Sequence, residues 1–211
     1  MQNTSHAVMS QRIEPGDSPD DFPTPPWATR ALLEYAIGPV GLDQLTCLEP
    51  ACGAGHMVKV LEEYFKEVRY ADAHNYGTAP IRDFLSFPYE TNAVDWVITN
   101  PPFRLAEEFV IRALDVSRIG VAVLVRTVFL ESVGRYNRLF MNDPPAKFAQ
   151  FVERVPMVKG RLDQKATTAT GYAWLIWEND VREQTKVVWI PPCRRKLEKP
   201  SDYSDRQLPL I

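Results

Sequence analysis

The feature of this sequence that most constrains its fold is an alternation of short apolar runs with amphipathic segments between residues 45 and 140. The apolar runs are as short as buried strands, and the segments between them carry apolar residues at helical spacing. The expected strands are residues 45–48, 68–71, 81–85, 94–99 and 120–127, and the expected helices are residues 28–37, 56–65, 105–116 and 131–140. Strands and helices that alternate in this way predict an α/β fold with a mostly parallel central sheet and helices on both faces.

The alternation of strand-like and helical segments ends at about Pro144. Residues 148–152, 172–177 and 187–190 have the character of strands, with few helical segments between them. Such strands fit an antiparallel addition to a parallel sheet. We therefore predict an antiparallel strand at one edge of the sheet.

The length of 211 residues is that of one domain with additional segments. Residues 1–20 are polar and lack an apolar core, which predicts a flexible N-terminal tail. We expect residues 21–190 to form the folded domain. Residues 191–211 are expected to be a C-terminal tail or a segment that covers a sheet edge.

Composition excludes several classes of protein. A formal net charge of −3 argues against binding nucleic acid by bulk charge, so any such contact needs a local basic patch. The three cysteines form no CxxC pair and the three histidines are scattered, which argues against a disulfide framework and against a metal site. A reducing cytoplasm is the expected setting. No apolar run approaches the roughly 20 residues of a membrane span, so no membrane partner is expected.

The first candidate binding loop is residues 48–55, Leu-Glu-Pro-Ala-Cys-Gly-Ala-Gly, between a predicted strand and a predicted helix. Gly53 and Gly55 can adopt positive φ and let the backbone approach a ligand closely. Ligands of open α/β sheets bind beyond the carboxyl ends of the strands. Val58 replaces the third glycine of the dinucleotide pattern GxGxxG, and no Gly-Lys-Ser/Thr is present, so a pyrophosphate ligand is disfavoured. Glu49 suits a cationic ligand better than an anionic one.

Acidic residues follow the next two predicted strands. Asp72 comes about 20 residues after the glycine loop, where doubly wound cofactor domains place the carboxylate that binds ribose hydroxyls. Asp83 and Phe84 could bind the amino group of an adenine and pack on its ring. Taken singly, each residue is also compatible with an ordinary turn or core position.

The second candidate loop follows the strand at residues 94–99 and reads Asn100-Pro101-Pro102-Phe103. The prolines stiffen the turn and cannot donate hydrogen bonds, whereas their carbonyl oxygens remain acceptors. The Asn100 side chain and the Pro101 carbonyl could accept both N–H bonds of a planar amino group, and Phe103 could stack on its ring. These two hydrogen bonds favour a more pyramidal nitrogen with an available lone pair. Catalysis then consists mostly of positioning the nitrogen and stabilising the positive charge that develops on it. Pro-Pro alone is common in turns, but Asn directly before Pro-Pro-Phe is much more specific.

Together the two loops resemble those of class I S-adenosylmethionine-dependent methyltransferases that modify exocyclic or amide nitrogens. The chain is most similar to small DNA adenine-N6 methyltransferases, including the unaccompanied ones of phages and prophages. The resemblance covers roughly residues 21 to 178, and it implies a Rossmann-like class I methyltransferase fold with S-adenosyl-L-methionine as cofactor. It implies a cofactor site made of Phe22, Thr24, Glu49, Ala51, Gly53, Gly55, Asp72, Asp83, Phe84 and Asn100. It implies a catalytic loop made of Asn100, Pro101, Pro102 and Phe103.

The resemblance also implies DNA as the partner, either double-stranded with the base flipped out or single-stranded. Restriction-type enzymes carry a separate target-recognition domain, for which this chain has no room. The specificity for DNA sequence would then be low, the recognised sequence would be short, or the N-terminal tail and the basic loop at residues 155–170 would read it. Lys159, Arg161 and Lys165 of that loop are candidate nucleic-acid contacts, or they form a solvated face.

Three other functions stay open. The same loop serves methylation of protein glutamine and of ribosomal RNA; glutamine enzymes usually carry Tyr after Pro-Pro, whereas this chain carries Phe103. A catalytically silent binding module would keep the fold, but the asparagine and the glycines are retained here. A dehydrogenase is disfavoured by the missing third glycine.

Overall fold

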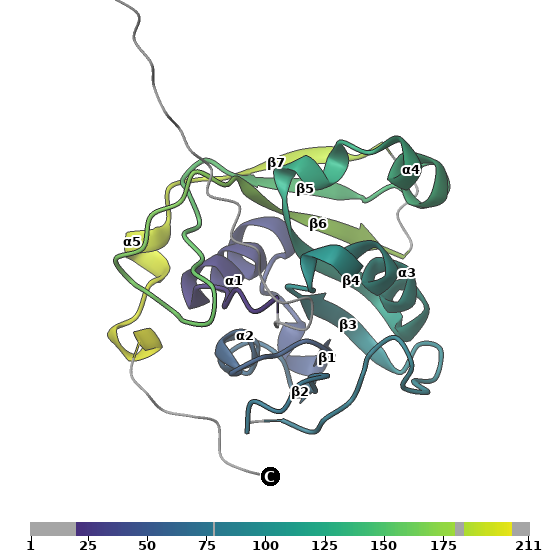
Figure 1. The fold of residues 1–211 in the computed structure, drawn as a ribbon, viewed down its shortest axis with the longest axis horizontal. Helices are drawn as coiled ribbons and strands as arrows, with labels where there is room; N and C mark the ends of the chain where they lie inside the picture. The colour runs from purple at the N-terminus through teal and green to yellow at the C-terminus, as the bar shows by residue number, and fades with distance from the viewer. Residues whose placement is uncertain (1–19, 78, 180–183, 204–211) are drawn as a thin grey trace, which may run out of the picture.

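The computed structural model describes residues 20–77, 79–179 and 184–203 (Figure 1). Within them, seven strands form one sheet in the order β2-β1-β3-β4-β6-β5-β7. The strands are β1 (Thr46–Glu49), β2 (Glu67–Tyr70), β3 (Val94–Thr99), β4 (Ser117–Arg126), β5 (Lys147–Phe151), β6 (Tyr172–Glu178) and β7 (Lys186–Ile190). The α-helices are α1 (Pro26–Leu32), α2 (His56–Leu61), α3 (Ala106–Val116), α4 (Val133–Arg135) and α5 (Arg194–Leu197). The π-helical segments are η1 (Leu33–Ile37) and η5 (Tyr136–Phe140), and the 3-10 helices are η2 (Leu42–Gln44), η3 (Phe103–Leu105), η4 (Thr127–Leu130) and η6 (Pro200–Tyr203).

The sheet is mostly parallel, as the sequence predicts. β2, β1, β3 and β4 run parallel, β6 is antiparallel to both of its neighbours, and β5 and β7 run parallel to each other. The prediction that the antiparallel strand lies at an edge is wrong, because β6 lies between β4 and β5 and the edge strands are β2 and β7. The reason lies in β6 itself. Six of its seven residues are buried, and a strand that is apolar on both faces belongs inside a covered sheet.

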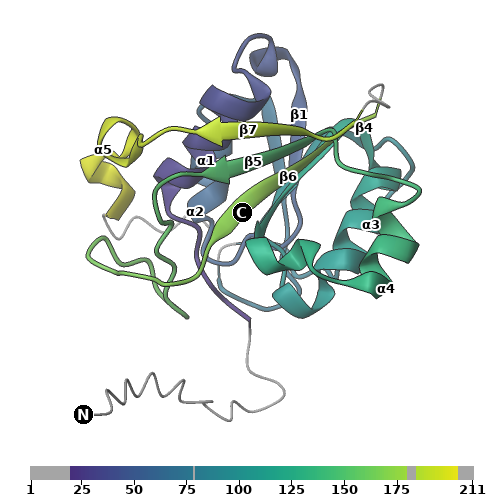
Figure 2. The same ribbon diagram turned by 90° about the horizontal axis from the view of Figure 1, so that it is seen from above.

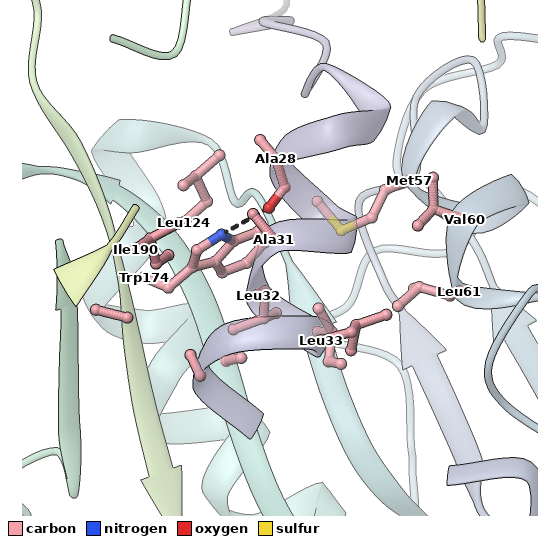
Figure 3. Close-up of a cluster of buried hydrophobic side chains, with 14 of the residues drawn as sticks. Ala28, Ala31, Leu32, Leu33, Met57, Val60, Leu61, Leu124, Trp174 and Ile190 are labelled. Atoms are coloured by element: carbon pink, nitrogen blue, oxygen red, sulfur yellow. Dashed lines mark hydrogen bonds between the residues drawn. The ribbon is translucent and has the colours of Figure 1, made fainter. Parts of the chain in front are cut away.

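Helices cover both faces of the sheet (Figure 2). On one face α1, η1 and α2 pack against β1, β3, β4 and β6, and on the other α3 and η5 pack against the same strands. Trp174 of β6 anchors the first face, since its indole nitrogen donates a hydrogen bond of 3.2 Å to the Ala28 carbonyl oxygen of α1 (Figure 3). The Trp174 ring is buried between β6 and α1, and its one polar atom is hydrogen-bonded. This contact therefore holds α1 on the sheet.

Residues 81–85 do not form the predicted strand. Only an isolated parallel bridge joins Asp72 to Ile81. The Asp83 carboxylate accepts hydrogen bonds from the Leu85 backbone nitrogen (3.1 Å) and the Ser86 hydroxyl (2.9 Å). A short acidic side chain that bonds the backbone two residues on favours a turn over a strand ladder. The loop after β2 is therefore irregular where we expect a third strand.

The other predicted elements are present with shifted ends. The helix expected at residues 56–65 ends at Leu61, and the one expected at residues 131–140 is divided into α4 and η5. No helix in the described part of the chain is both long and apolar enough to cross a membrane.

The segment after β7 packs beside α1 rather than along the sheet edge (Figure 1). Arg30 of α1, 3% exposed, is the centre of this contact. Its guanidinium donates to both carboxylate oxygens of Glu63, to both of Asp202 and to the Leu197 carbonyl oxygen, at 2.7–2.9 Å. These bonds tie residues 194–203 to α1. Residues 1–19 and 204–211, where we expect tails, lie outside the described residues.

Candidate functional site

A cavity of about 510 Å³ opens at the carboxyl ends of the parallel strands. Its walls come from the segment before α1, the loop after β1, the loop after β2 and the loop after β3. Of the residues expected at the site, those that line it are Phe22, Thr24, Glu49, Ala51, Gly53, Asp72, Asp83, Phe84, Asn100 and Pro102. Gly55, Pro101 and Phe103 do not line it. Most of the residues predicted from four separate segments thus meet around one cavity.

The glycine loop has the backbone that its sequence predicts. Gly53 has φ +51° and Gly55 has φ +80°, both in the left-handed region that favours glycine. A Cβ built on Gly53 would lie no closer than 3.7 Å to any neighbour, so the backbone angle and not space requires glycine there. The Gly53 nitrogen donates to Asp72 Oδ2 at 2.8 Å, and Asp72 Oδ1 accepts from the His74 nitrogen at 2.8 Å. Asp72 thereby fixes the loop after β1 to the loop after β2.

Glu49, at the end of β1, is 1% exposed beneath the cavity. Its Oε1 accepts from the Thr99 hydroxyl at 2.5 Å and from the Ala51 nitrogen at 3.1 Å, so both bonds fall on one oxygen. Burial raises the pKa of Glu49 from 4.5 to about 8, against the lowering effect of these two bonds. The second carboxylate oxygen receives no hydrogen bond from the described residues, which leaves it for a ligand.

The lining of the cavity is acidic. It includes four aspartates, Asp20, Asp21, Asp72 and Asp83, together with Glu49, against one arginine, Arg104. Burial and the nearby Asp72 raise the pKa of Asp21, while Lys159 opposes the shift. Burial and the nearby Lys59 lower the pKa of His56, so this imidazole adds little positive charge. The cavity therefore suits a ligand that carries positive charge.

Asn100 follows β3 and is held by the chain before α1. Its Nδ2 donates to the Phe22 carbonyl oxygen at 2.8 Å and lies 3.9 Å from the Met157 sulfur. Because Nδ2 makes these contacts, Oδ1 faces away from Phe22 and Met157. It is buried there without a hydrogen-bond partner. A buried acceptor that lacks a donor costs free energy, so this atom is set to receive an N–H from a bound molecule.

The rest of the catalytic loop is fixed from several sides. Asp20 Oδ2 accepts from the Phe103 nitrogen at 2.7 Å, and the Pro102 carbonyl oxygen accepts from the Leu105 nitrogen at 2.9 Å. The Asp20 bond corrects the expectation that residue 20 belongs to a free tail. Pro101 is buried, and the cavity lining includes neither it nor Phe103.

The Phe103 ring is part of a small aromatic cluster. Its centroid lies 5.4 Å from that of Phe22 and 6.2 Å from that of Tyr172. The Arg126 guanidinium carbon lies 4.2 Å from the Phe103 ring centre, within cation–π range. The ring that we expect to stack on a target base is therefore already in contact with three side chains.

The basic loop lies next to the segment before α1. The Gly160 nitrogen donates to the Asp21 carbonyl oxygen at 2.9 Å, so residues 155–170 come close to the cavity wall. Within the loop, Arg161 forms an exposed ion pair of 3.2 Å with Asp163, and the Lys165 nitrogen also bonds Asp163. None of the three predicted nucleic-acid contacts lines the cavity.

Sequence reasoning missed several residues at the site. Asp20 and Asp21 stand directly before Phe22, and the polar residues before them led to the assignment of Asp20 to a tail and gave Asp21 no role at the site. Tyr76 lines the cavity from a loop without regular structure. Arg126 ends a strand that reads as purely apolar, and only its place after the fourth parallel strand could have indicated a role.

Comparisons with known proteins give the fold and no more. No family model matches the chain, and no curated protein matches it. A modification subunit of a putative type I restriction enzyme from Vibrio vulnificus is similar in structure, with a TM-score of 0.55 and 18% identity over 77% of this chain and 45% of that one. This chain thus spans less than half of that protein.

Two smaller proteins show the same likeness over most of their length. One is a putative RNA methyltransferase from Pyrococcus horikoshii, with a TM-score of 0.52 and 18% identity over 72% of this chain and 82% of that one. The other is a predicted O-methyltransferase from Agrobacterium tumefaciens, with a TM-score of 0.52 and 10% identity over 80% of this chain and 86% of that one. The chain therefore has the Rossmann-like fold of class I methyltransferases.

Proposed function

We propose that this protein is an S-adenosylmethionine-dependent methyltransferase that methylates the exocyclic N6 amino group of adenine in DNA. One observation carries the proposal. Asn100 Oδ1 is a buried acceptor without a donor, at the end of β3 and on the wall of an acidic cavity. This acceptor is suited to an N–H of a planar amino group that enters beside a positively charged cofactor.

The residues of the cavity fit the cofactor. S-Adenosylmethionine carries a sulfonium and an ammonium group, and the four aspartates of the lining, which outnumber its single arginine, favour such positive charge. Glu49 has an oxygen without a protein donor, and the buried Thr24 hydroxyl has no hydrogen-bond partner. Asp72 lies where a ribose would be bound by the rule for doubly wound folds. When bound, the cofactor supplies an electrophilic methyl group.

The residues of the chain supply position and charge. Asn100 Oδ1 accepts one N–H of the target amino group, which orients the nitrogen and supports the positive charge that develops on it. The hydrogen bond from Asn100 Nδ2 to the Phe22 carbonyl oxygen keeps the acceptor in place before the substrate arrives. No strong base is needed at the start, because the amino proton can leave after the transfer.

Adenine in DNA is the target that these observations favour. A planar aromatic amine fits the acceptor at Asn100. Stacking of the base on Phe103 would require its ring to give up part of its contact with Phe22, Tyr172 or Arg126. Phe rather than Tyr after Pro-Pro argues against a protein glutamine substrate. The similarity to a modification subunit of a type I restriction enzyme supports DNA, while that to an RNA methyltransferase keeps RNA as the second candidate.

The test is a transfer assay with radiolabelled S-adenosylmethionine. We expect label in unmethylated DNA, recovered as N6-methyladenine after digestion to nucleosides. Matched RNA and a protein extract serve as competing substrates in the same assay. Label found only in RNA or protein would refute the DNA assignment, and cofactor binding without transfer to any substrate would favour a silent binding module.

A further inference from the structure

Arg126 lies at the carboxyl end of β4, beside the catalytic loop, and pairs with no carboxylate of the described residues. Its Nε is buried without a hydrogen-bond partner. Its guanidinium lies 4.2 Å from the Phe103 ring centre and 5.9 Å from that of Phe22. At the opposite end of the same strand, Arg118 donates two hydrogen bonds to Asp95. Arg126 also interacts with the Tyr172 hydroxyl. It thus holds a positive charge next to the target loop without an ion-pair partner among the described residues.

A second arginine stands near the same strand end. The Thr127 nitrogen donates to the Gly171 carbonyl oxygen at 3.0 Å, directly beyond the pairing of Arg126 with Tyr172. A Cβ built on Gly171 would lie 3.0 Å from the Thr127 hydroxyl oxygen and 3.3 Å from Arg154 Nη1. The hydroxyl and the second guanidinium therefore flank the same residue. Arg154 is exposed and, among the described residues, it has no carboxylate partner either.

We infer that Arg126 and Arg154 bind a phosphodiester group of the nucleic acid strand that presents the target base. Guanidinium groups match phosphate oxygens in charge and in the spacing of their donors. The Thr127 hydroxyl can donate to the same phosphate. This inference rests on the proposed function in one respect, which is that the substrate is a nucleic acid.

The charge distribution of the site assigns separate places to cofactor and substrate. Four aspartates and one arginine, Arg104, line the cofactor cavity, so the cavity favours a phosphate less than the arginines outside it do. Arg126 lies against the Phe103 ring and pairs with Tyr172 of β6, and Arg154 lies beside Gly171, the residue before Tyr172. Arg161 differs from them because its charge is already paired with Asp163. A strand bound at Arg126 and Arg154 would bring its base next to Phe103, whose backbone nitrogen is already bonded to Asp20.

The salt dependence of oligonucleotide binding tests this inference. Fluorescence anisotropy would measure the affinity of the full chain for a labelled single-stranded oligonucleotide across a series of salt concentrations. Each phosphate contact to a single strand contributes roughly 0.7 to the slope of log affinity against log salt. Because both arginines are assigned to one phosphate, the double variant Arg126→Gln/Arg154→Gln is expected to lower the slope by about 0.7, and each single variant should lower it by part of that amount. The Arg118→Gln control should leave the slope unchanged. Arg118→Gln removes the same charge as Arg126→Gln, and Arg118 lies on the same strand as Arg126.

Arg126→Lys separates phosphate binding from simple packing on Phe103. Lysine keeps the charge, so a phosphate contact predicts a slope close to that of the parent chain. If Arg126 only supports the ring, Arg126→Gln will leave the slope unchanged, and this result would overturn the inference. Absence of oligonucleotide binding by the parent chain would overturn it as well.

The two proposals can fail separately. A slope that depends on both arginines, with no methyl transfer to DNA, would uphold the phosphate site and refute the proposed reaction. Methyl transfer to DNA with unchanged slopes in both variants would uphold the reaction and refute the phosphate site. The same measurements with RNA of equal sequence would show which strand the two arginines prefer.

Discussion

The side-chain amide of Asn100 donates a hydrogen bond of 2.8 Å to the main-chain carbonyl oxygen of Phe22, 78 residues earlier in the chain. This bond fixes which end of the amide faces the site, because Nδ2 is occupied and Oδ1 is left as the acceptor. The segment before α1 thus has two functions. It lines the cavity, and it orients the residue on which the proposed chemistry depends.

Replacing Asn100 by Ala removes the acceptor while the cofactor cavity keeps its other walls. We expect kcat to fall by about 10²–10³-fold, the usual effect of losing one preorganised polar group, with cofactor affinity largely retained. The measurement is labelled methyl transfer together with calorimetric cofactor binding. Asn142→Ala, at an exposed turn, is the control. Full activity of Asn100→Ala would remove the proposed role.

Asp20 is expected to act as a positioning residue through the Phe103 nitrogen. Asp20→Ala leaves this donor without its acceptor, a loss of about 1.5–3 kcal/mol for a bond to a charged group, and kcat/KM should drop by about tenfold or more. Asp20→Asn keeps an oxygen acceptor and should restore most of the activity. If the Asp20→Asn variant stays as inactive as Asp20→Ala while both variants bind the cofactor equally well, the charge of Asp20 matters more than its hydrogen bond.

Glu49 makes cofactor affinity depend on pH. Burial raises the pKa of Glu49 to about 8, so the carboxyl is largely protonated near neutral pH in the cofactor-free protein. A cationic ligand favours the ionised form, and its binding then releases a proton. Affinity should rise with pH up to about 8 and then level off. Titration calorimetry in buffers of different ionisation enthalpy measures the released proton, and Glu49→Gln should abolish the release.

The same shift in pKa affects stability in the opposite sense. Because the folded protein holds the Glu49 proton more tightly than the unfolded chain does, the stability from this group is complete below pH 4.5 and is lost as pH rises through 8. Thermal unfolding of the cofactor-free protein and of Glu49→Gln between pH 5 and pH 8.5 should diverge in this direction. Parallel curves would contradict the assigned pKa.

Arg30→Met tests the contact between α1 and the chain after β7. The substitution leaves the Asp202 carboxylate, whose side chain is 4% exposed, without its counter-ion. Breaking a buried pair in this way costs about 3–5 kcal/mol. Arg69→Met, which breaks an exposed pair with Glu67, should cost under about 1 kcal/mol. Chemical denaturation of both variants measures the difference, and equal losses would show that the Arg30 bonds add little.

The sequence predicts the parallel part of the fold well, because each of these strands is a short apolar run with a helix after it. β3 coincides with the prediction at residues 94–99. Two features escape prediction for physical reasons. Asp83 forms a side-chain turn that replaces the expected strand, and the position of β6 depends on pairing partners far apart in the sequence.

The residues of the candidate site likewise divide into those that local sequence predicts and those that it does not. Gly53, Asp72 and Asn100 are predictable because a motif and a strand end coincide at each of them. Asp20 and Arg126 act through contacts with residues more than 20 positions away, with Phe103 in both cases, and no local pattern marks them. Local motifs therefore identify the loops, whereas the residues that hold those loops require the three-dimensional structure.

Arg30 finally bears on the order in which this protein can assemble during synthesis. It lies in the first described helix, and its partner Asp202 follows 172 residues later. The contact between α1 and residues 194–203 therefore forms only after the chain as far as Asp202 has been synthesised. Until then, Glu63 is the one acidic partner of Arg30 from this contact that has already been made. α1 directly follows the segment that orients Asn100, so a contact made late in synthesis also helps to hold one wall of the cavity.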